Sequence, residues 1–137
     1  MKVTLDTNIL LSATFWEGDP FKIIEKIEDG EIELVLSEEI IEEFSEVLEY
    51  KEIQDKIISK NLEIKWAVEE IVALSKIVDP QRKINIVKDD EDDNKIIECA
   101  LEGICDYIIT RDKHLLKLKE FEGIKIVAPE DFMKLVS

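Results

Sequence analysis

Apolar residues recur along the chain at two spacings, and these spacings predict strands that alternate with helices. Short apolar runs predict strands at residues 2–5, 33–36, 106–110 and 124–127, with a further short strand at residues 84–87. Apolar positions three or four residues apart predict helices at residues 9–13, 19–29, 37–50, 51–59, 62–77, 92–103, 112–119 and 129–136. Strands that alternate with helices favour a parallel sheet covered on both faces. We therefore expect an α/β fold, in which residues 1–137 form one three-layer α/β/α sandwich around a central, mainly parallel sheet.

Residues typical of helix ends support several of these boundaries. We expect Thr7 or Asn8 to cap the helix at residues 9–13, and Ser37 to cap the helix that follows it. Pro20 suits the first turn of its helix. The two helices between residues 51 and 77 are expected to form an antiparallel pair joined near residues 60–61. No repeat and no linker interrupts the pattern, which favours a single domain.

The composition limits the classes of protein that the chain can represent. It has 137 residues, with 33 acidic and 18 basic side chains and a formal net charge of −15. No apolar run is long enough for a membrane span, and the N-terminus lacks the pattern of a secretory signal, so we expect a cytoplasmic protein without membrane contact. Cys99 and Cys105 have neither zinc-ligand spacing nor the pattern of a disulfide framework, and we expect both to be buried.

The strong negative charge argues against a general nucleic-acid binder, because such proteins usually carry a basic surface. Two alternatives remain. Either the partner is not a nucleic acid, or a carboxylate-rich pocket acts through a divalent cation.

Four carboxylates occupy positions that suggest such a pocket. Asp6 and Asp112 each follow a predicted strand, and in open parallel sheets ligands bind beyond the carboxyl ends of the strands. Each of these two is equally well explained as the N-cap of the next helix. At about 100° per residue, Asp93 points within about 20° of the centre of the apolar stripe on its helix. By the same count Glu43 lies about 100° from the stripe on its own helix, nearer than the other acids there.

Acids that converge in this way repel one another unless a cation lies between them. Oxygen ligands without His or Cys favour Mg²⁺ or Mn²⁺. An EF-hand is excluded, because the acidic run at residues 89–93 is not followed by the Gly and Glu that such a loop requires. An ion in the pocket would polarise a phosphoryl oxygen and position water for attack, so the pattern fits phosphodiester hydrolysis.

The same residues carry a resemblance to a known family. The segments are, in order, LDTNILLSA, LSEEIIEEFSEVL, DDEDDNKIIECALEG, DYIITRDKHLL and GIKIVAPEDF. Together they resemble PIN-domain proteins, most closely the VapC-like toxin ribonucleases of toxin–antitoxin pairs. The resemblance implies a Rossmann-like sandwich, Mg²⁺- or Mn²⁺-dependent endoribonuclease activity on RNA, frequent homodimerisation and, in the toxin group, an antitoxin partner.

Carried over by position, the resemblance assigns both metal binding and catalysis to the four acids already singled out, namely Asp6, Glu43, Asp93 and Asp112. It assigns a supporting role in the pocket to Asn8 and Thr110.

One position departs from the family pattern. Many members carry a further Asp where this chain has His114, which leaves the number of metal ions open at one or two. Asp92 is a candidate replacement for that acid. His114 is itself a candidate for a phosphate contact or a proton donor, although a surface position early in a helix explains it equally.

Basic residues around Asp112 offer a partial answer to the objection from charge. Arg111, Lys113, Lys117 and Lys119 lie close together in the sequence and could hold an RNA backbone, in which case binding should weaken as salt rises. A solvated helix face is the ordinary alternative. The segment at residues 56–65 is a second candidate.

Aromatic residues and the overall charge leave a different function open. Phe15 and Trp16 belong either to the core or to a partner surface, and an exposed Trp16 would suit a dimer or antitoxin contact. Trp66 is expected in the core. The acidity and His114 also fit a catalytically weak PIN-fold binding module that acts through a protein partner.

Overall fold

The computed structural model describes residues 1–59, 64–87 and 91–136. Within them, the strands are β1 (Lys2–Leu5), β2 (Glu33–Ser37), β3 (Ser75–Val78), β4 (Tyr107–Ile109), β5 (Glu120–Phe121) and β6 (Ile124–Val127). They form a sheet in the order β3-β2-β1-β4-β6-β5, parallel except for β5, which pairs antiparallel with β6 at one edge. The helices are α1 (Thr7–Phe15), α2 (Asp19–Glu28), α3 (Glu38–Leu48), α4 (Lys51–Ser59), α5 (Ile64–Leu74), α6 (Glu91–Glu102), α7 (Lys113–Leu116) and α8 (Pro129–Val136).

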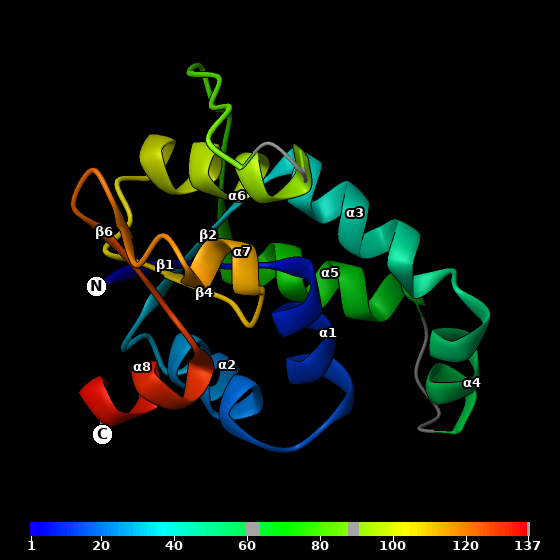
Figure 1. Cartoon of the computed structure of the whole chain (residues 1–137). Helices are drawn as coiled ribbons and strands as arrows, with labels where there is room; N and C mark the ends of the chain where they lie inside the picture. Colours follow the sequence, from blue (N-terminus) through cyan, green and yellow to red (C-terminus); the bar gives the residue numbers. More distant parts are fainter. Residues whose placement is uncertain (60–63, 88–90, 137) are drawn as a thin grey trace.

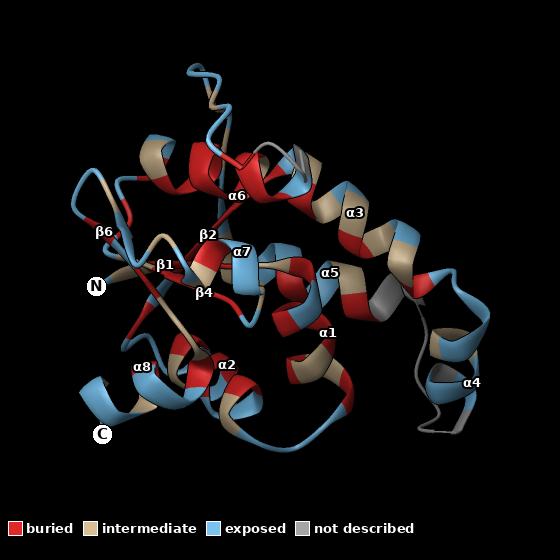
Figure 2. Ribbon diagram, viewed as in Figure 1, coloured by how far each residue is buried: buried red, intermediate tan, exposed pale blue. Residues whose placement is uncertain are grey.

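Helices cover both faces of the sheet, with α6 on one side and α2 and α8 on the other (Figure 1). Helix α6 packs against β1, β2 and β4, while α2 packs against α1 and α8. Buried residues occupy strands β1, β2, β4 and β6 and the inward faces of these helices (Figure 2), and they include the enclosed rings of Phe15, Phe44 and Phe132. A mostly parallel sheet between helical layers confirms the predicted α/β fold.

The central strand β1 explains why acidic residues gather at one edge of the sheet. Its residues Val3, Thr4 and Leu5 are all fully buried, as expected for a strand covered on both faces. Leu5 aligns with Ile109 of the neighbouring parallel strand β4. The next residue of each strand, Asp6 in one case and Thr110 in the other, therefore leaves the sheet at the same carboxyl edge.

The predicted strand at residues 84–87 is wrong, because side chains of α6 bind its backbone instead of a neighbouring strand. The Oδ1 atom of Asn94 accepts hydrogen bonds from the amides of Ile86 at 3.0 Å and Val87 at 2.9 Å. The Nδ2 atom of Asn94 donates to the carbonyl of Val87 at 2.7 Å. Glu98 Oε2 accepts from the amide of Ile84 at 2.9 Å. These bonds tie the connecting segment to the helix that carries Asp93.

Three other boundaries differ from the sequence prediction. The helix predicted at residues 62–77 ends at Leu74, because Ser75–Val78 pairs with β2 as an edge strand. The helix predicted at residues 112–119 is limited to Lys113–Leu116, and Lys119 has a positive φ of 64° that no α-helix contains. Strand β5 has two residues, too few to show any periodicity. The expected junction near residues 60–61 lies outside the described residues.

At the start of α1, the structure selects one of the capping residues that the sequence allows. The Oδ1 atom of Asp6 accepts a hydrogen bond from the amide of Ile9 at 3.0 Å, so Asp6 is the N-cap and neither Thr7 nor Asn8 has this role. Ser37 caps α3 as predicted.

Two expectations from composition can be compared directly with the structure. Cys99 and Cys105 are buried free thiols, and burial raises the pKa of Cys99 to about 11 and that of Cys105 to about 12. Within the described ranges, no helix combines the length and the apolar character that crossing a membrane requires.

Candidate metal centre

The sheet supplies two of the four predicted acids, and each of them caps a helix. Asp6 follows β1, where its Oδ1 binds the amide of Ile9 and its Oδ2 accepts a hydrogen bond from the hydroxyl of Thr110. Asp112 lies just beyond β4, and its Oδ1 accepts from the amide of His114 at 2.8 Å as the N-cap of α7. Thr110 Oγ1 also accepts from the Asp112 amide at 3.0 Å. One buried hydroxyl therefore links the two acids.

Two helices supply the other acids. Asp93, in the first turn of α6, is only 7% exposed, in agreement with the inward angle that the sequence predicts. Glu43, in the middle of α3, is half-buried and hydrogen-bonds to the Thr7 side chain. Sequence reasoning missed this role of Thr7, although its place directly after Asp6 already puts it at the carboxyl edge of the sheet.

The four acids line one cleft, together with other residues of α1, α3 and α6. Its lining consists of Asp6, Thr7, Asn8, Ile40, Glu43, Asp92, Asp93, Ile96 and Asp112. The cleft has a volume of about 90 Å³. This is room for about three water molecules at ~30 Å³ each, and far less than the ~300 Å³ of a small-molecule pocket. The cleft can therefore enclose an ion with a few water molecules but not a nucleotide.

The environment of the cleft raises the pKa of two of its acids, Asp6 and Glu43. Burial raises the pKa of Asp6, and the nearby charge of Asp112 raises it further, while the hydrogen bond from Thr110 opposes both effects. Burial also raises the pKa of Glu43, against the hydrogen bond from Thr7. These shifts show that the metal-free fold disfavours full ionisation of the cleft.

The donor set fits a small divalent cation. The acids of the cleft present carboxylate oxygens, which are the ligands that Mg²⁺ and Mn²⁺ prefer in proteins. A dication would also offset the burial and, to a smaller extent, the repulsion that raise the pKa of Asp6 and Glu43. The residues that the resemblance assigns to metal binding are therefore chemically suited to it.

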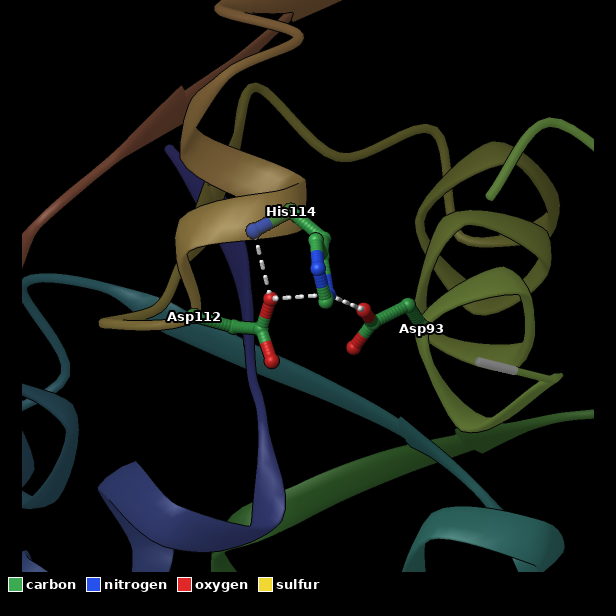
Figure 3. Close-up of side chains that lie close together, drawn as sticks. All are labelled: Asp93, Asp112 and His114. Atoms are coloured by element: carbon green, nitrogen blue, oxygen red, sulfur yellow. Dashed lines mark hydrogen bonds and ion pairs between the residues drawn. The ribbon is translucent and has the colours of Figure 1, made fainter. Parts of the chain in front are cut away.

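The two residues of uncertain role both lie at the rim. Asp92 is exposed and lines the cleft, with its Oδ1 3.3 Å from Lys95 Nζ. His114 Nδ1 is 3.7 Å from Asp112 Oδ1 and 4.0 Å from Asp93 Oδ2. The three side chains converge, Asp93 from α6, His114 from α7 and Asp112 from the N-cap of α7 (Figure 3). Lys95, which sequence reasoning did not single out, is the cation whose charge opposes the raised pKa of Glu43.

The basic residues around Asp112 divide into two groups. Arg111 forms an ion pair with Glu130 and lowers the pKa of that carboxyl, so its charge is partly compensated. Lys113, Lys117 and Lys119 are exposed and have no ion pair within the described ranges.

Trp16 lies on the surface, as do Phe21 and Tyr50. It is 43% exposed, packs edge-on against the buried ring of Phe15 and carries Lys56 Nζ 5.4 Å above its own ring. The side chain of Trp66 lies outside the described part of the chain, and the segment at residues 56–65 is described only in part.

The cleft lies at the carboxyl edge of a mostly parallel sheet, which is where open α/β domains bind their ligands. Residues 2–114 match the family model described as PIN domain, and the chain belongs to this family. PIN domains are generally nucleases that use divalent metals. Neither a search of curated proteins nor a search of solved structures found a match.

Proposed function

We propose that the chain is a divalent-metal-dependent endoribonuclease that hydrolyses RNA phosphodiester bonds with water as the nucleophile. The observation that carries this proposal is the convergence of four acids from separate elements, Asp6, Glu43, Asp93 and Asp112, on one cleft. Family membership supports the same chemistry, since PIN domains are generally nucleases.

In this proposal the acids have distinct tasks. Asp6, Asp93 and Asp112 hold Mg²⁺ or Mn²⁺ through their carboxylate oxygens, and Glu43 ligates the ion or orients the attacking water. The ion supplies Lewis-acid polarisation of the phosphoryl oxygen and a lower pKa for bound water. Thr110 fixes the Asp6 carboxylate by its hydrogen bond, and Asn8 lines the cleft beside it.

The RNA backbone is proposed to lie across the mouth of the cleft, because the cleft itself is too small for a nucleotide. Lys113 and Lys117 are exposed beside Asp112 and are suited to contact phosphates. Arg111 is a weaker candidate, since Glu130 already pairs with it.

The wider biological setting belongs to the proposal as well. We propose that residues 1–137 act as a single domain in the cytoplasm, as the toxin of a toxin–antitoxin pair, and that the chain forms a homodimer. The exposed Trp16 supports a protein contact of this kind, because aromatic residues are enriched in interfaces.

The direct test is cleavage of a mixed RNA pool with Mn²⁺, with Mg²⁺ and with EDTA. We expect the Asp6→Asn variant to lose activity by about a hundred-fold or more, which corresponds to about 2.7 kcal/mol of transition-state stabilisation. Glu25→Gln, which changes an exposed acid of α2 outside the cleft, is the matched control. Activity that survives Asp6→Asn would contradict the assignment. Absence of cleavage under all metals, with a tight protein partner, would favour the binding module instead.

A further inference from the structure

The chain contains a single histidine, and its ring lies against the carboxylate cleft. His114 is the second residue of α7, and its side chain is 58% exposed. Its Nδ1 atom is 3.7 Å from Asp112 Oδ1 and 4.0 Å from Asp93 Oδ2 (Figure 3). Donor atoms of all three residues lie within 4.8 Å of one another. A nitrogen donor and two carboxylates from different elements thus surround a common point.

The distances fit shared coordination better than direct pairing. Both separations of Nδ1 from the carboxylate oxygens exceed the ~3.2 Å limit of a good hydrogen bond. Two ligands of one octahedral ion at about 2.1 Å are about 3.0 Å apart when adjacent and about 4.2 Å apart when opposite. The separation of 4.0 Å is close to the second value, and that of 3.7 Å lies between the two. Small rotations of an exposed ring therefore suffice to complete the geometry.

The backbone around His114 also fixes where the ring can reach. The amide of His114 donates to Asp112 Oδ1 at 2.8 Å, as part of the cap of α7. This bond keeps the first turn of α7 next to Asp112. The imidazole is consequently held beside Asp112 and within 4.0 Å of Asp93.

We propose that His114 Nδ1 is a direct nitrogen ligand of the ion held by Asp93 and Asp112. The centre would then have mixed oxygen and nitrogen ligands, and it would favour ions that accept imidazole, such as Mn²⁺ and Co²⁺, over Mg²⁺. This inference rests on the proposed function, because it assumes that the acids of the cleft hold a divalent ion.

The single histidine makes the test specific, since any histidine nitrogen signal from bound metal must come from His114. Electron spin-echo modulation of bound Mn²⁺ detects directly coordinated imidazole nitrogen. Calorimetric titration with Mn²⁺, Co²⁺ and Mg²⁺ gives the three affinities independently of any RNA cleavage. The proteins to compare are the wild type, His114→Gln, His114→Asp and the surface control Lys134→Gln.

We expect nitrogen modulation in the wild type and in Lys134→Gln, and none in His114→Gln. The affinity of His114→Gln for Co²⁺ should fall by about ten- to a hundred-fold, with a smaller loss for Mg²⁺. His114→Asp offers oxygen in place of nitrogen, so its preference should move toward Mg²⁺. Because the ring is exposed, circular dichroism and urea unfolding should match the wild type in both variants.

Two negative results have different meanings. If wild-type protein binds Mn²⁺ without nitrogen modulation, and His114→Gln binds it equally well, the inference about His114 is wrong while the proposed nuclease stands. If wild-type protein binds no divalent ion and Asp6→Asn changes nothing in the titration, the proposed function is wrong and the inference fails with it.

Discussion

The two sides of the cleft hold their carboxylates by different means. On the sheet side, Asp6 and Asp112 follow β1 and β4, and each accepts a backbone amide hydrogen bond as the N-cap of a helix. On the helix side, Asp93 lies in the first turn of α6 and Glu43 in the middle of α3. Asp6 and Asp112 therefore have a capping role that Glu43, in the middle of its helix, lacks.

This difference separates the energetic roles of the four acids. A cap carboxylate stabilises its helix through hydrogen bonds and the helix dipole, with or without a cation. The Glu43 carboxylate, which projects from the middle of a helix toward other acids, gains less without a cation, because burial and repulsion oppose its charge. Substitutions on the sheet side should therefore lower stability, whereas neutralising Glu43 should raise the stability of the metal-free protein.

The largest effect on stability is expected at Thr110, the buried residue that links the two sheet-side acids. Thr110→Val keeps the shape of the side chain but removes the donor to Asp6 and the acceptor for the Asp112 amide. Two groups lose their hydrogen bonds, at about 1–3 kcal/mol each, so we expect a loss of about 3 kcal/mol in the free energy of unfolding by urea. Thr110→Ser retains the hydroxyl and should lose only about 1 kcal/mol. Equal losses in the two variants would show that the hydroxyl does not support the acids.

On the helix side the corresponding support is Asn94, which is buried next to Asp93 in α6. Asn94→Ala removes the acceptor for the Ile86 and Val87 amides and the donor to the Val87 carbonyl. Val87 is buried and Ile86 is largely exposed, so water can replace only part of the loss. We expect a destabilisation of about 2 kcal/mol, with faster hydrogen exchange at the Val87 amide. Unchanged exchange there would show that the segment is held by other contacts.

The contrast between the two sides also explains what the sequence could predict. Asp6 and Asp112 could be predicted as site residues because their positions follow from a local pattern alone: a short apolar strand, an acid and then a helix. Asp93 could be predicted because helical periodicity shows which residues of a helix point toward the core. The hydrogen bond between Glu43 and Thr7 could not be predicted, because it joins two helices and no local pattern in the sequence shows how they lie relative to each other.

The incorrect predictions have the same physical origin. The apolar run at residues 84–87 resembles a strand, but Asn94 and Glu98 satisfy its backbone from a helix. The pattern at residues 75–77 predicts the continuation of a helix, but residues 75–78 form a strand because they pair with β2. In each case the partner of the backbone lies far along the chain or in another element, where propensity carries no information.

A smaller effect should separate capping from charge at Asp112. Asp112→Ala removes the N-cap of α7 and should lose about 1 kcal/mol of stability. Asp112→Asn retains a good cap, so its unfolding free energy should lie within about 0.5 kcal/mol of the wild type. Both variants should bind Mn²⁺ more weakly in titration calorimetry, because both lack the anionic ligand. If Asp112→Asn loses as much stability as Asp112→Ala, the negative charge of Asp112 supports the fold and its capping hydrogen bonds do not.

The smallest effect, and the one with opposite sign, is expected for Glu43→Gln in EDTA. The variant keeps an acceptor for the Thr7 hydroxyl but removes a charge that burial and the neighbouring Asp92 disfavour. Because Glu43 remains partly open to solvent, we expect a gain of only about 0.5 kcal/mol at neutral pH. Saturating Mn²⁺ should reverse the sign, since the wild type then gains more from ion binding than the variant does.

The pH dependence of this gain follows from the direction of the pKa shift. Burial raises the pKa of Glu43 in the folded protein above its ordinary value of 4.5, so the folded state binds more protons than the unfolded state over the interval between the two values. Wild-type stability therefore falls as pH rises through that interval, and the variant lacks this contribution. The advantage of Glu43→Gln should accordingly vanish below pH 4.5 and grow to a plateau above the raised pKa. Glu42→Gln, at an exposed position on the same helix, should show no such trend. A parallel trend in that control would assign the effect to the overall negative charge of the chain instead of to the cleft.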